Sequence, residues 1–386
     1  MRVMFISTPG VGHTFPMVPL AWAFRSAGHE VLFATSGQSL SITNAGVDVV
    51  DLTPEFGPPA FWQPMMIRIA KENPELAEQM AAMRNGKVSD LRTVAGFLSK
   101  LSGVLADGAI ELAHDWQPDL LVQSRSQGSG LVVAAKLGIP LVDHGIGISR
   151  TPDMHELHRR NMADVFDRHG VVALPERRIG LDVAPPSVIE GEPEGWPMRF
   201  VPYNGGAVLP DWLAAVPDRP RVAVTLGSVS ALGEDGIATL RQLIATASGA
   251  DAEFVFALPD VDLDALGELP ANVRVAGWLP LAALLPGCAA LIHHGGGSTT
   301  LTAFDAGVPQ LVLPDGADRH ISAAAVRRRG TGLVAEQADR ELIEAVLSDA
   351  ALRTAATEVR AEIRAMSTPA AVAERLVAER LVAEAA

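Results

Sequence analysis

The sequence predicts an α/β protein built from two doubly wound domains. Short apolar runs alternate with longer amphipathic stretches, a pattern typical of a parallel sheet covered by helices on both faces. The alternation lapses over residues 175–206, which are rich in Pro and Gly, and then restarts. The length of 386 residues agrees with two domains of roughly 100–200 residues each.

The first domain is expected at residues 1–205. Its short apolar runs predict buried strands, and its amphipathic runs predict helices. The strands are expected at residues 3–7, 31–34, 120–122 and 141–142, and the helices at residues 15–27 and 130–137.

The second domain is expected at residues 206–365. Its strands are expected at residues 222–226, 253–257, 273–276, 290–293 and 310–313, with a helix at residues 235–246. Residues 355–386 are rich in Ala, Glu and Arg at helical spacing, which predicts a long closing helix. Its last part, residues 366–386, is expected to pack back on the first domain.

Composition excludes several classes of protein. A hydrophobic share of 48% indicates a globular chain, and a net charge of −14 argues against a broad nucleic-acid site. Cys288 is the only cysteine, so neither an intrachain disulfide nor a cysteine-rich metal site is possible. No apolar run reaches the roughly 20 residues that span a bilayer, and the N-terminus lacks the pattern of a secretion signal. We therefore expect a cytoplasmic protein that does not bind membranes.

Residues 291–314, LIHHGGGSTTLTAFDAGVPQLVLP, predict an anion site. A strand ending at His293 leads into glycines, and a helix is expected to begin near Ser298 or Thr299. Glycines such as Gly296 and Gly297 let a ligand approach the backbone, and a helix N-terminus attracts negative charge. His293 could donate a further hydrogen bond to a phosphate. The alternative is a tight turn whose histidines only pack.

Other polar or aromatic residues follow the strands of the same domain. Ser228 ends the run VAVTLGSVS and could contact a second phosphate, or it could only cap a helix. Trp278 could stack on a nucleobase, or it could be a core residue. Asp318, with Asp315 beside it, could accept hydrogen bonds from sugar hydroxyls, or it could only form a turn.

The first domain contains one candidate general base. His13 lies at the first strand-to-helix turn, where a helix dipole favours the neutral imidazole that can accept a proton near pH 7. The alternative is a structural histidine. A dinucleotide fingerprint starting at Gly10 and Gly12 would require a third glycine where Phe15 stands.

An apolar wall for an acceptor is a further candidate in the first domain. Trp62, Met65 and Met66, followed by Met80 and Met83, could form it because Met side chains adapt to irregular ligands. Core packing is the alternative for all five residues.

Four motifs together resemble the family one glycosyltransferases, and more narrowly the actinobacterial enzymes that attach deoxysugars to natural products of enediyne and polyketide pathways. The motifs are GVGHTFPMVPLA near the start, VPYNGG at the boundary, GWLP, and HHGGGSTTLTAFDAGVPQLVLPDGADRH. The resemblance covers almost the whole chain. It implies the GT-B fold, in which two Rossmann-like domains face each other across a cleft.

The resemblance also implies roles for individual residues. His13 corresponds to the base that deprotonates the acceptor hydroxyl, and Asp318 to the acid that faces the sugar. The remaining matches concern the donor nucleotide: Trp278 and its neighbour Leu279 at the base, and His293, Gly296, Gly297, Ser298, Thr299 and Ser228 at the diphosphate.

Three positions depart from the family pattern. Ser124 stands where many relatives have an Asp that orients the base histidine, so Ser124 is the candidate orienting position. Thr302 stands where relatives that use ribonucleotide sugars often have a Glu for the ribose hydroxyls, which favours a deoxyribose and hence a dTDP-sugar. Arg319 replaces the Gln of an Asp-Gln pair, which favours a sugar other than glucose.

We therefore expect an inverting, metal-independent glycosyltransferase that needs no cofactor. It would move a deoxyhexose from dTDP to a hydrophobic polyketide aglycone in antibiotic biosynthesis. The acceptor would lie mainly on the first domain and the donor on the second. Two alternatives remain, namely a catalytically silent nucleotide-binding partner of another transferase and an NAD-dependent oxidoreductase. The sequence does not decide whether the protein forms a homodimer. It also does not decide whether the new glycosidic bond is to oxygen or to carbon.

Overall fold

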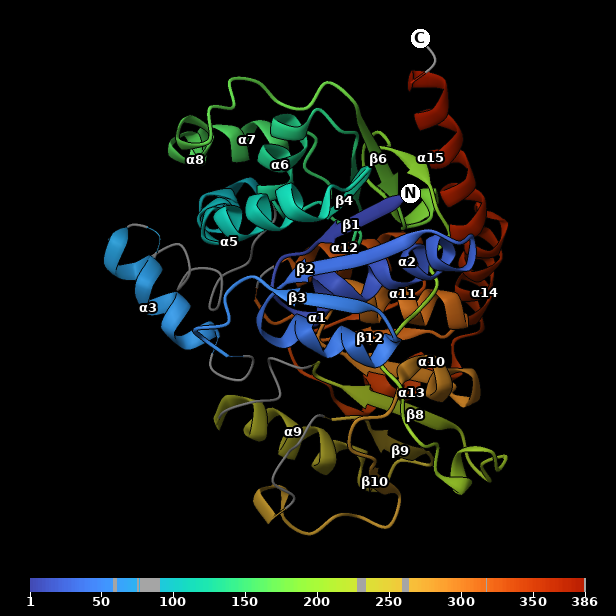
Figure 1. Ribbon diagram of the computed structural model, residues 1–386. Helices are drawn as coiled ribbons and strands as arrows, with labels where there is room; N and C mark the ends of the chain where they lie inside the picture. The colour runs from blue at the N-terminus through green and yellow to red at the C-terminus, as the bar shows by residue number, and fades with distance from the viewer. Residues whose placement is uncertain are drawn as a thin grey trace. The chain divides into compact units, whose positions relative to one another are not determined.

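The computed structural model describes residues 1–57, 61–74, 76, 91–227, 234–258, 264–316 and 318–384 (Figure 1). The chain divides into two compact units. Unit 1 comprises residues 1–184, 190–200 and 366–386, and unit 2 comprises residues 185–189 and 201–365.

Unit 1 is built on a parallel sheet with the strand order β3-β2-β1-β4-β5-β6-β7. Its strands are β1 (Arg2–Ile6), β2 (Glu30–Thr35), β3 (Asp48–Asp51), β4 (Leu120–Ser124), β5 (Leu141–His144), β6 (Arg178–Asp182) and β7 (Trp196–Pro197). Its α-helices are α1 (Val11–Thr14), α2 (Val18–Ser26), α3 (Trp62–Glu72), α5 (Ala95–Trp116), α6 (Ser129–Leu137), α7 (Met154–Asn161), α8 (Ala163–Arg168) and α15 (Pro369–Glu384).

Unit 2 is built on a second parallel sheet, with the strand order β10-β9-β8-β11-β12-β13. Its strands are β8 (Arg221–Thr225), β9 (Glu253–Phe256), β10 (Val273–Val275), β11 (Ala290–His293), β12 (Gln310–Val312) and β13 (Gly332–Val334). Its α-helices are α9 (Glu234–Ala247), α10 (Leu281–Leu284), α11 (Gly297–Ala306), α12 (Arg319–Arg329), α13 (Arg340–Ser348) and α14 (Ala350–Ala365).

Both sheets have the doubly wound order in which the chain reverses direction beside the first strand of the unit. Consecutive residues of β1 point to opposite faces of the sheet, and Val3, Met4, Phe5 and Ile6 are all fully buried. Burial on both faces explains why the sequence shows continuous apolar runs rather than alternation. The expected α/β class is confirmed.

Prolines alter two of the expected helices. The helix expected at residues 15–27 begins as a 3₁₀ turn, Phe15–Met17, and continues as α2, because Pro16 and Pro19 lack the N–H that a continuous helix requires. The long closing helix is divided into α14 and α15, and Pro369 is the first residue of α15. Helix α15 packs against α2 in unit 1.

Helix α5 and the turn before it, Leu91–Trp116, are long and apolar enough to cross a membrane by length and composition alone. Leu98, Leu101, Leu105 and Ala109 on this helix are buried inside unit 1. The apolar surface is therefore used for packing within the unit.

Candidate active site

The topology of unit 1 brings the loops after β1 and β4 together. These strands are neighbours although more than a hundred residues separate them, and Ile6 pairs with Gln123 near their carboxyl ends. In doubly wound sheets, ligands bind beyond these carboxyl ends at the point where the strand order reverses. His13 lies after β1, and Ser124 and Ser126 lie at the end of β4 and just beyond it.

The hydroxyl beside His13 belongs to Ser126. Its Oγ lies 2.9 Å from His13 Nδ1 and 3.1 Å from Thr8 Oγ1. Ser124 Oγ instead accepts a hydrogen bond from the Thr8 N–H at 3.2 Å. The hydroxyl that contacts the His13 ring is thus that of Ser126, whereas Ser124, the residue we expected in the orienting position, contacts the backbone of Thr8.

A cluster of hydroxyl groups holds the turn that carries His13. Thr14 Oγ1 lies 2.6 Å from Ser39 Oγ and 2.7 Å from Ser7 Oγ, and Ser39 Oγ also accepts from the Gly10 N–H at 2.7 Å. Gly10 has a φ of 134°, which side-chain-bearing residues rarely adopt. The hydroxyl cluster and Gly10 therefore hold this turn in one conformation.

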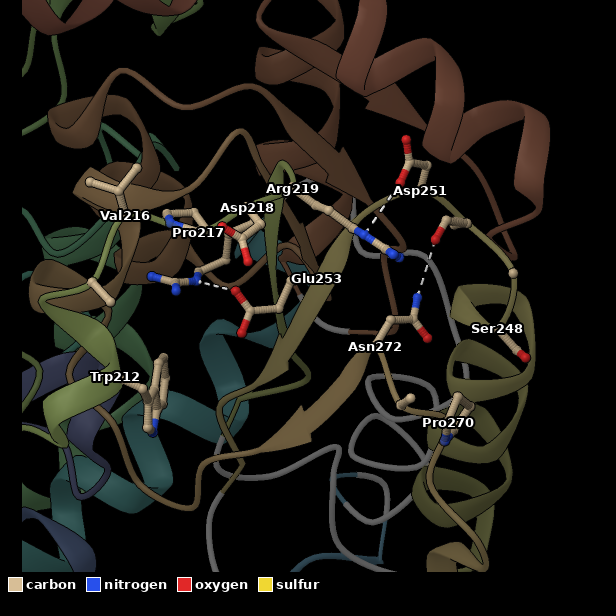
Figure 2. Close-up of a pocket in the computed structure, with 15 residues that line it drawn as sticks. Trp212, Val216, Pro217, Asp218, Arg219, Ser248, Asp251, Glu253, Pro270 and Asn272 are labelled. Atoms are coloured by element: carbon tan, nitrogen blue, oxygen red, sulfur yellow. Dashed lines mark hydrogen bonds and ion pairs between the residues drawn. The ribbon is translucent and has the colours of Figure 1, made fainter.

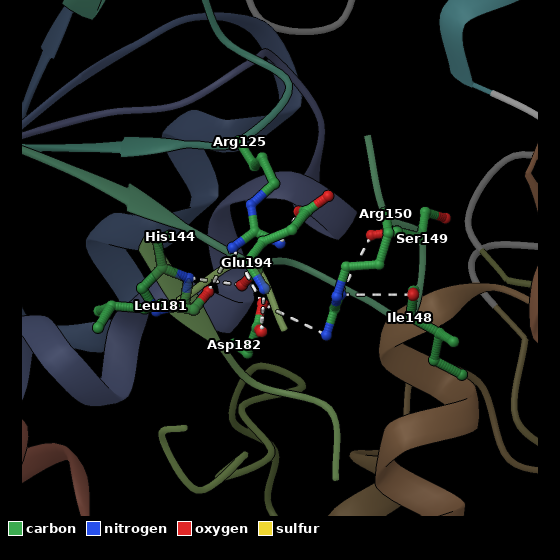
Figure 3. A network of polar contacts seen from close by, with 9 residues as sticks. Arg125, His144, Ile148, Ser149, Arg150, Leu181, Asp182 and Glu194 are labelled. Atoms are coloured by element: carbon green, nitrogen blue, oxygen red, sulfur yellow. Dashed lines mark hydrogen bonds and ion pairs between the residues drawn. The ribbon is translucent and has the colours of Figure 1, made fainter. Parts of the chain in front are cut away.

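Buried ion pairs hold the loop after β4 (Figure 3). Arg125 Nη1 lies 2.6 Å from Glu194 Oε2, and Arg125 Nη2 lies 3.0 Å from Asp182 Oδ1, which Arg150 Nη2 also approaches at 3.3 Å. Burial raises the pKa of Glu194, and the two arginines oppose that rise. Sequence reasoning missed this network because the four charges are far apart in the chain and share no spacing.

Trp62 lies near His13. A methyl group added at Gly10 would lie 3.6 Å from His13 Cδ2 and 3.9 Å from Trp62 Cζ2, so the two rings flank Gly10. Trp62 and Met66 are partly buried, whereas Met65 is fully buried in the cluster formed by α3 and α5. Trp62 and Met66 can therefore offer surface to a ligand, while Met65 supports them. Met80 and Met83 lie outside the described residues.

The topology of unit 2 repeats this arrangement. Strands β8 and β11 are neighbours, with Thr225 paired to His293, so the loops that follow them meet at one edge. The β8 loop is described as far as Gly227, which has a φ of 75°, and Ser228 lies outside the described residues. A methyl group at Gly227 would lie 2.6 Å from His294 Cε1, and one at Gly296 would lie 2.5 Å from His294 Nε2. The His294 ring therefore fills the space between the two loops.

His293 contacts protein groups at both ring nitrogens. The Gly295 N–H donates to Nδ1 at 3.1 Å, so Nε2 carries the proton and donates to Gln310 Oε1 at 2.9 Å. The ring is fully buried, and burial lowers its pKa to about 4. His293 is thus neutral and shapes the glycine loop, and the hydrogen bond to a phosphate that we expected from it is not available in this arrangement.

The first turn of α11 combines half-buried residues with one buried hydroxyl that has no partner among the described residues. Gly296 precedes the helix and has no side chain to cap it, and Gly296, Gly297, Ser298 and Thr299 are all half-buried. Ser298 Oγ has no hydrogen-bond partner among the atoms that the structure describes. Free N–H groups and a hydroxyl at the positive end of a helix dipole form a suitable site for an anion.

Trp278 is anchored by its N–H group, and its rings remain half exposed. Nε1–H donates to the Asn204 carbonyl at 3.0 Å, and Gly205 lies against the indole. The residue is 47% exposed, which excludes the alternative of a core tryptophan. The neighbouring Leu279 is buried in a core cluster, so only its backbone could reach a ligand.

The Thr302 side chain points inward. It is 1% exposed, and its hydroxyl donates to the Ser298 carbonyl at 2.7 Å. Asp318 immediately precedes α12, and Arg319 folds back so that Nη1 contacts the Asp315 carbonyl and lies 3.4 Å from Asp315 Oδ2. Burial lowers the pKa of Arg319.

Family models match most of the chain. The N-terminal domain of "Erythromycin biosynthesis protein CIII-like" matches residues 22–227, and the corresponding C-terminal domain matches residues 241–379. The chain belongs to this family. It is a glycosyltransferase with the GT-B fold.

Individual glycosyltransferases are similar over almost the full length. The elloramycin glycosyltransferase ElmGT of Streptomyces olivaceus is 43% identical, over 97% of both chains. The crystal structure of SnogD from Streptomyces nogalater is 41% identical, with a TM-score of 0.84 and coverage of 98% of this chain and 99% of SnogD. The spinosyn rhamnosyltransferase SpnG, complexed with thymidine diphosphate, is 29% identical, with a TM-score of 0.80 and coverage of 97% and 100%. These relatives are named as glycosyltransferases or as a rhamnosyltransferase. Their names argue against the two alternatives, an NAD-dependent oxidoreductase and a catalytically silent partner of another transferase.

The enzyme also has a surface pocket in unit 2 (Figure 2). Trp212, Arg219, Glu253 and Asn272 are among the residues that line it. Glu253 is the first residue of β9, so the pocket lies at the amino ends of the strands. Ligands of doubly wound sheets bind at the opposite edge, and we therefore do not assign the donor to this pocket.

Proposed function

We propose that this glycosyltransferase moves a deoxyhexose from a dTDP-sugar to a hydrophobic, polyketide-type aglycone, with inversion at the anomeric carbon. The observation that carries the proposal is the edge of the second sheet, where the uncapped α11 N-terminus, Ser298 and the half-exposed Trp278 are found in one unit. A diphosphate suits the helix N-terminus, and a nucleobase suits the indole face.

The preference for deoxyribose is supported by Thr302. Its hydroxyl is buried and already donates to a backbone carbonyl, so it offers nothing to a ribose 2′-hydroxyl. A site that does not satisfy a polar ligand group gains nothing from burying it. The relative SpnG was solved with thymidine diphosphate and, separately, with spinosyn aglycone, which supports the same donor and acceptor classes here.

His13 in unit 1 would take the proton of the acceptor hydroxyl, with Trp62 and Met66 against the aglycone. The α11 N-terminus would offset the charge that develops on the leaving diphosphate, as preorganised dipoles do in other enzymes. We further propose that Asp318 faces the sugar, and that the enzyme acts in the cytoplasm with the nucleotide sugar as its only co-substrate.

The nucleotide preference is tested by thermal shift with dTDP, UDP, GDP and NAD at equal concentrations. We expect the largest upward shift with dTDP, because a ligand that binds only the folded state raises its stability. A larger shift with UDP or NAD would contradict the proposed donor. Turnover of a dTDP-deoxysugar with a polyketide aglycone is then the direct test of the reaction.

A further inference from the structure

We propose that Ser126 and Thr8 form a hydroxyl relay that selects the tautomer of His13. The proposal rests on the proposed function, in which His13 is the general base. Ser126 and Thr8 are positioning residues, since they act through His13. Both are buried, with exposed fractions of 7% for Ser126 and 2% for Thr8.

The relay follows from the proton count of a neutral imidazole. The ring carries one proton, and it can accept a proton at Nε2 only if that proton sits on Nδ1. Nδ1–H would then donate to Ser126 Oγ at 2.9 Å, and the Ser126 hydroxyl would donate onward to Thr8 Oγ1 at 3.1 Å. In the reverse direction, Thr8 donates to Ser126 and Ser126 donates to Nδ1. That arrangement leaves the proton on Nε2, and His13 is then inactive as a base.

The relay differs from a carboxylate partner in one decisive way. A carboxylate only accepts hydrogen bonds, so it holds the proton on Nδ1 and also stabilises the charged ring. A hydroxyl can both donate and accept a hydrogen bond, and it carries no charge. His13 is therefore active as a base only when the Ser126 hydroxyl donates to Thr8 Oγ1 and not to His13 Nδ1. Thr8 Oγ1 therefore acts on the tautomer of His13 through the hydroxyl of Ser126.

The surrounding structure keeps Ser126 in place for this role. Its neighbour Arg125 is fixed by the buried ion pairs with Asp182 and Glu194. The N–H of Gln127 closes a turn on the Ser124 carbonyl at 2.8 Å. The N–H of Thr8 is also held, by Ser124 Oγ at 3.2 Å. Both ends of the relay are thus positioned by rigid elements.

In the reaction, the acceptor hydroxyl gives its proton to His13 Nε2. Its oxygen forms a bond to the anomeric carbon as the bond from that carbon to the diphosphate breaks, and the diphosphate leaves with the electron pair. The imidazolium then holds protons on both nitrogens, and Nδ1–H still donates to Ser126. The hydrogen bond to Ser126 brings no negative charge to the imidazolium, so we expect rates to depend strongly on the acidity of the acceptor.

The experiment compares kcat and the pH dependence of kcat/KM for the wild type, Ser126→Ala, Thr8→Val and the double variant. Each single change should lower kcat roughly two- to tenfold, the value of one hydrogen bond, with the donor KM unchanged. The double variant should be no slower than Ser126→Ala, because the two residues act in series. Ser129→Ala is the matched control, since its buried hydroxyl has no partner among the described atoms, and it should leave kcat unchanged.

Two further measurements separate tautomer control from simple structural support. Ser126→Asp should move the acid limb of kcat/KM to higher pH, because a nearby negative charge raises the pKa of a histidine. Imidazole ¹⁵N shifts, assigned to His13 by comparison with His13→Ala, should report mainly Nδ1–H in the wild type and more Nε2–H in Thr8→Val.

The outcomes distinguish this proposal from the proposed function. If His13→Ala turned over substrate at the wild-type rate, both would fall. If His13→Ala lost activity while Thr8→Val changed neither kcat nor the ¹⁵N shifts, the relay would be wrong and the role of His13 as the base would stand. Losses that add in the double variant would also overturn it. A Ser126→Ala chain that failed to fold would leave Thr8→Val and the ¹⁵N measurement as the deciding tests.

Discussion

Adjacent residues of the same type have different surroundings in this enzyme. His293 is enclosed at the end of β11 and contacts Gln310 and the Gly295 N–H, whereas His294 fills the gap between Gly227 and Gly296. Burial lowers the pKa of both rings, so neither carries charge at neutral pH. No charged imidazole would therefore attract a diphosphate in this unit, and hydrogen bonds from backbone N–H groups, hydroxyls or a neutral imidazole N–H would have to hold it.

Trp278→Ala should weaken dTDP binding roughly 5- to 150-fold, since stacking of a base on an aromatic ring contributes about 1–3 kcal/mol. The kcat at a saturating donor concentration should change less than the affinity for dTDP. Calorimetric titration with dTDP measures the effect, and Trp278→Phe should retain most of the affinity. Trp22 provides the matched control, because it is 41% exposed and its N–H also donates to a backbone carbonyl, that of Ala45, but it lies in unit 1. An equal loss in Trp22→Ala would argue against stacking on Trp278.

At the level of elements, the binding loops depend on glycines that leave room for neighbouring rings. The α11 N-terminus lies beside His294, and the missing side chain at Gly296 is what allows the ring to fit. The sequence motif predicted a close approach of a ligand to this backbone, which stays a prediction. It could not predict that the nearest partner is a protein side chain.

Gly296→Ala should therefore weaken dTDP binding at least tenfold, because its Cβ would lie 2.5 Å from His294 Nε2 and the loop must shift. A misplacement of donors by even 1 Å is costly in a preorganised site. Gly206→Ala is the control in the same unit, since a Cβ there would meet nothing within 4 Å. Titration with dTDP, with circular dichroism to confirm folding, measures both variants. Normal affinity in Gly296→Ala would show that the loop adapts.

The sequence predicted the central strands of both sheets well and several outer strands poorly, and burial explains the difference. Central strands such as β1 and β8 are buried on both faces, so their apolar runs stand out. Strand β6 falls in the segment where we expected no regular structure, because its first three residues are only half-buried and carry little pattern. Ser126 was missed in favour of Ser124 because only the fold shows which hydroxyl reaches His13.

At the scale of the whole molecule, neutral buried histidines occur in both units. His144 and His158 in unit 1 and His293 in unit 2 each have a pKa lowered to about 4, first of all by burial. Such groups link folding to pH, because the unfolded chain exposes them to water. Asp143 and Glu194 act in the opposite sense, since burial raises the pKa of both carboxyl groups.

His158 offers the cleanest test of this linkage. Its ordinary pKa is 6.5 and its folded value is about 4, lowered by burial and then by His155. Above pH 6.5 the ring is neutral in both states and contributes nothing. Between 6.5 and 4 only the unfolded chain takes up the proton, so the free energy of unfolding falls as pH falls. From pH 7.5 to 5.5 the loss from this one group should be about 1.3 kcal/mol.

The pH dependence of the wild-type stability cannot isolate His158, because protonation of the buried carboxyl groups has the opposite effect on the free energy of unfolding. The contribution of His158 is therefore measured as the difference between the variant and the wild type. Urea unfolding of the whole enzyme at pH 7.5 and 5.5 should show a smaller loss of stability in His158→Gln than in the wild type, by about 1.3 kcal/mol. The variant should be less stable at pH 7.5, since the ring also bonds Ser99 Oγ at 2.9 Å. Ser99→Ala is the control, because it removes the hydrogen bond but keeps the imidazole, so its loss of stability between the two pH values should stay close to that of the wild type. Parallel pH curves for His158→Gln and the wild type would mean that the buried ring takes up its proton as readily in the folded enzyme as in water.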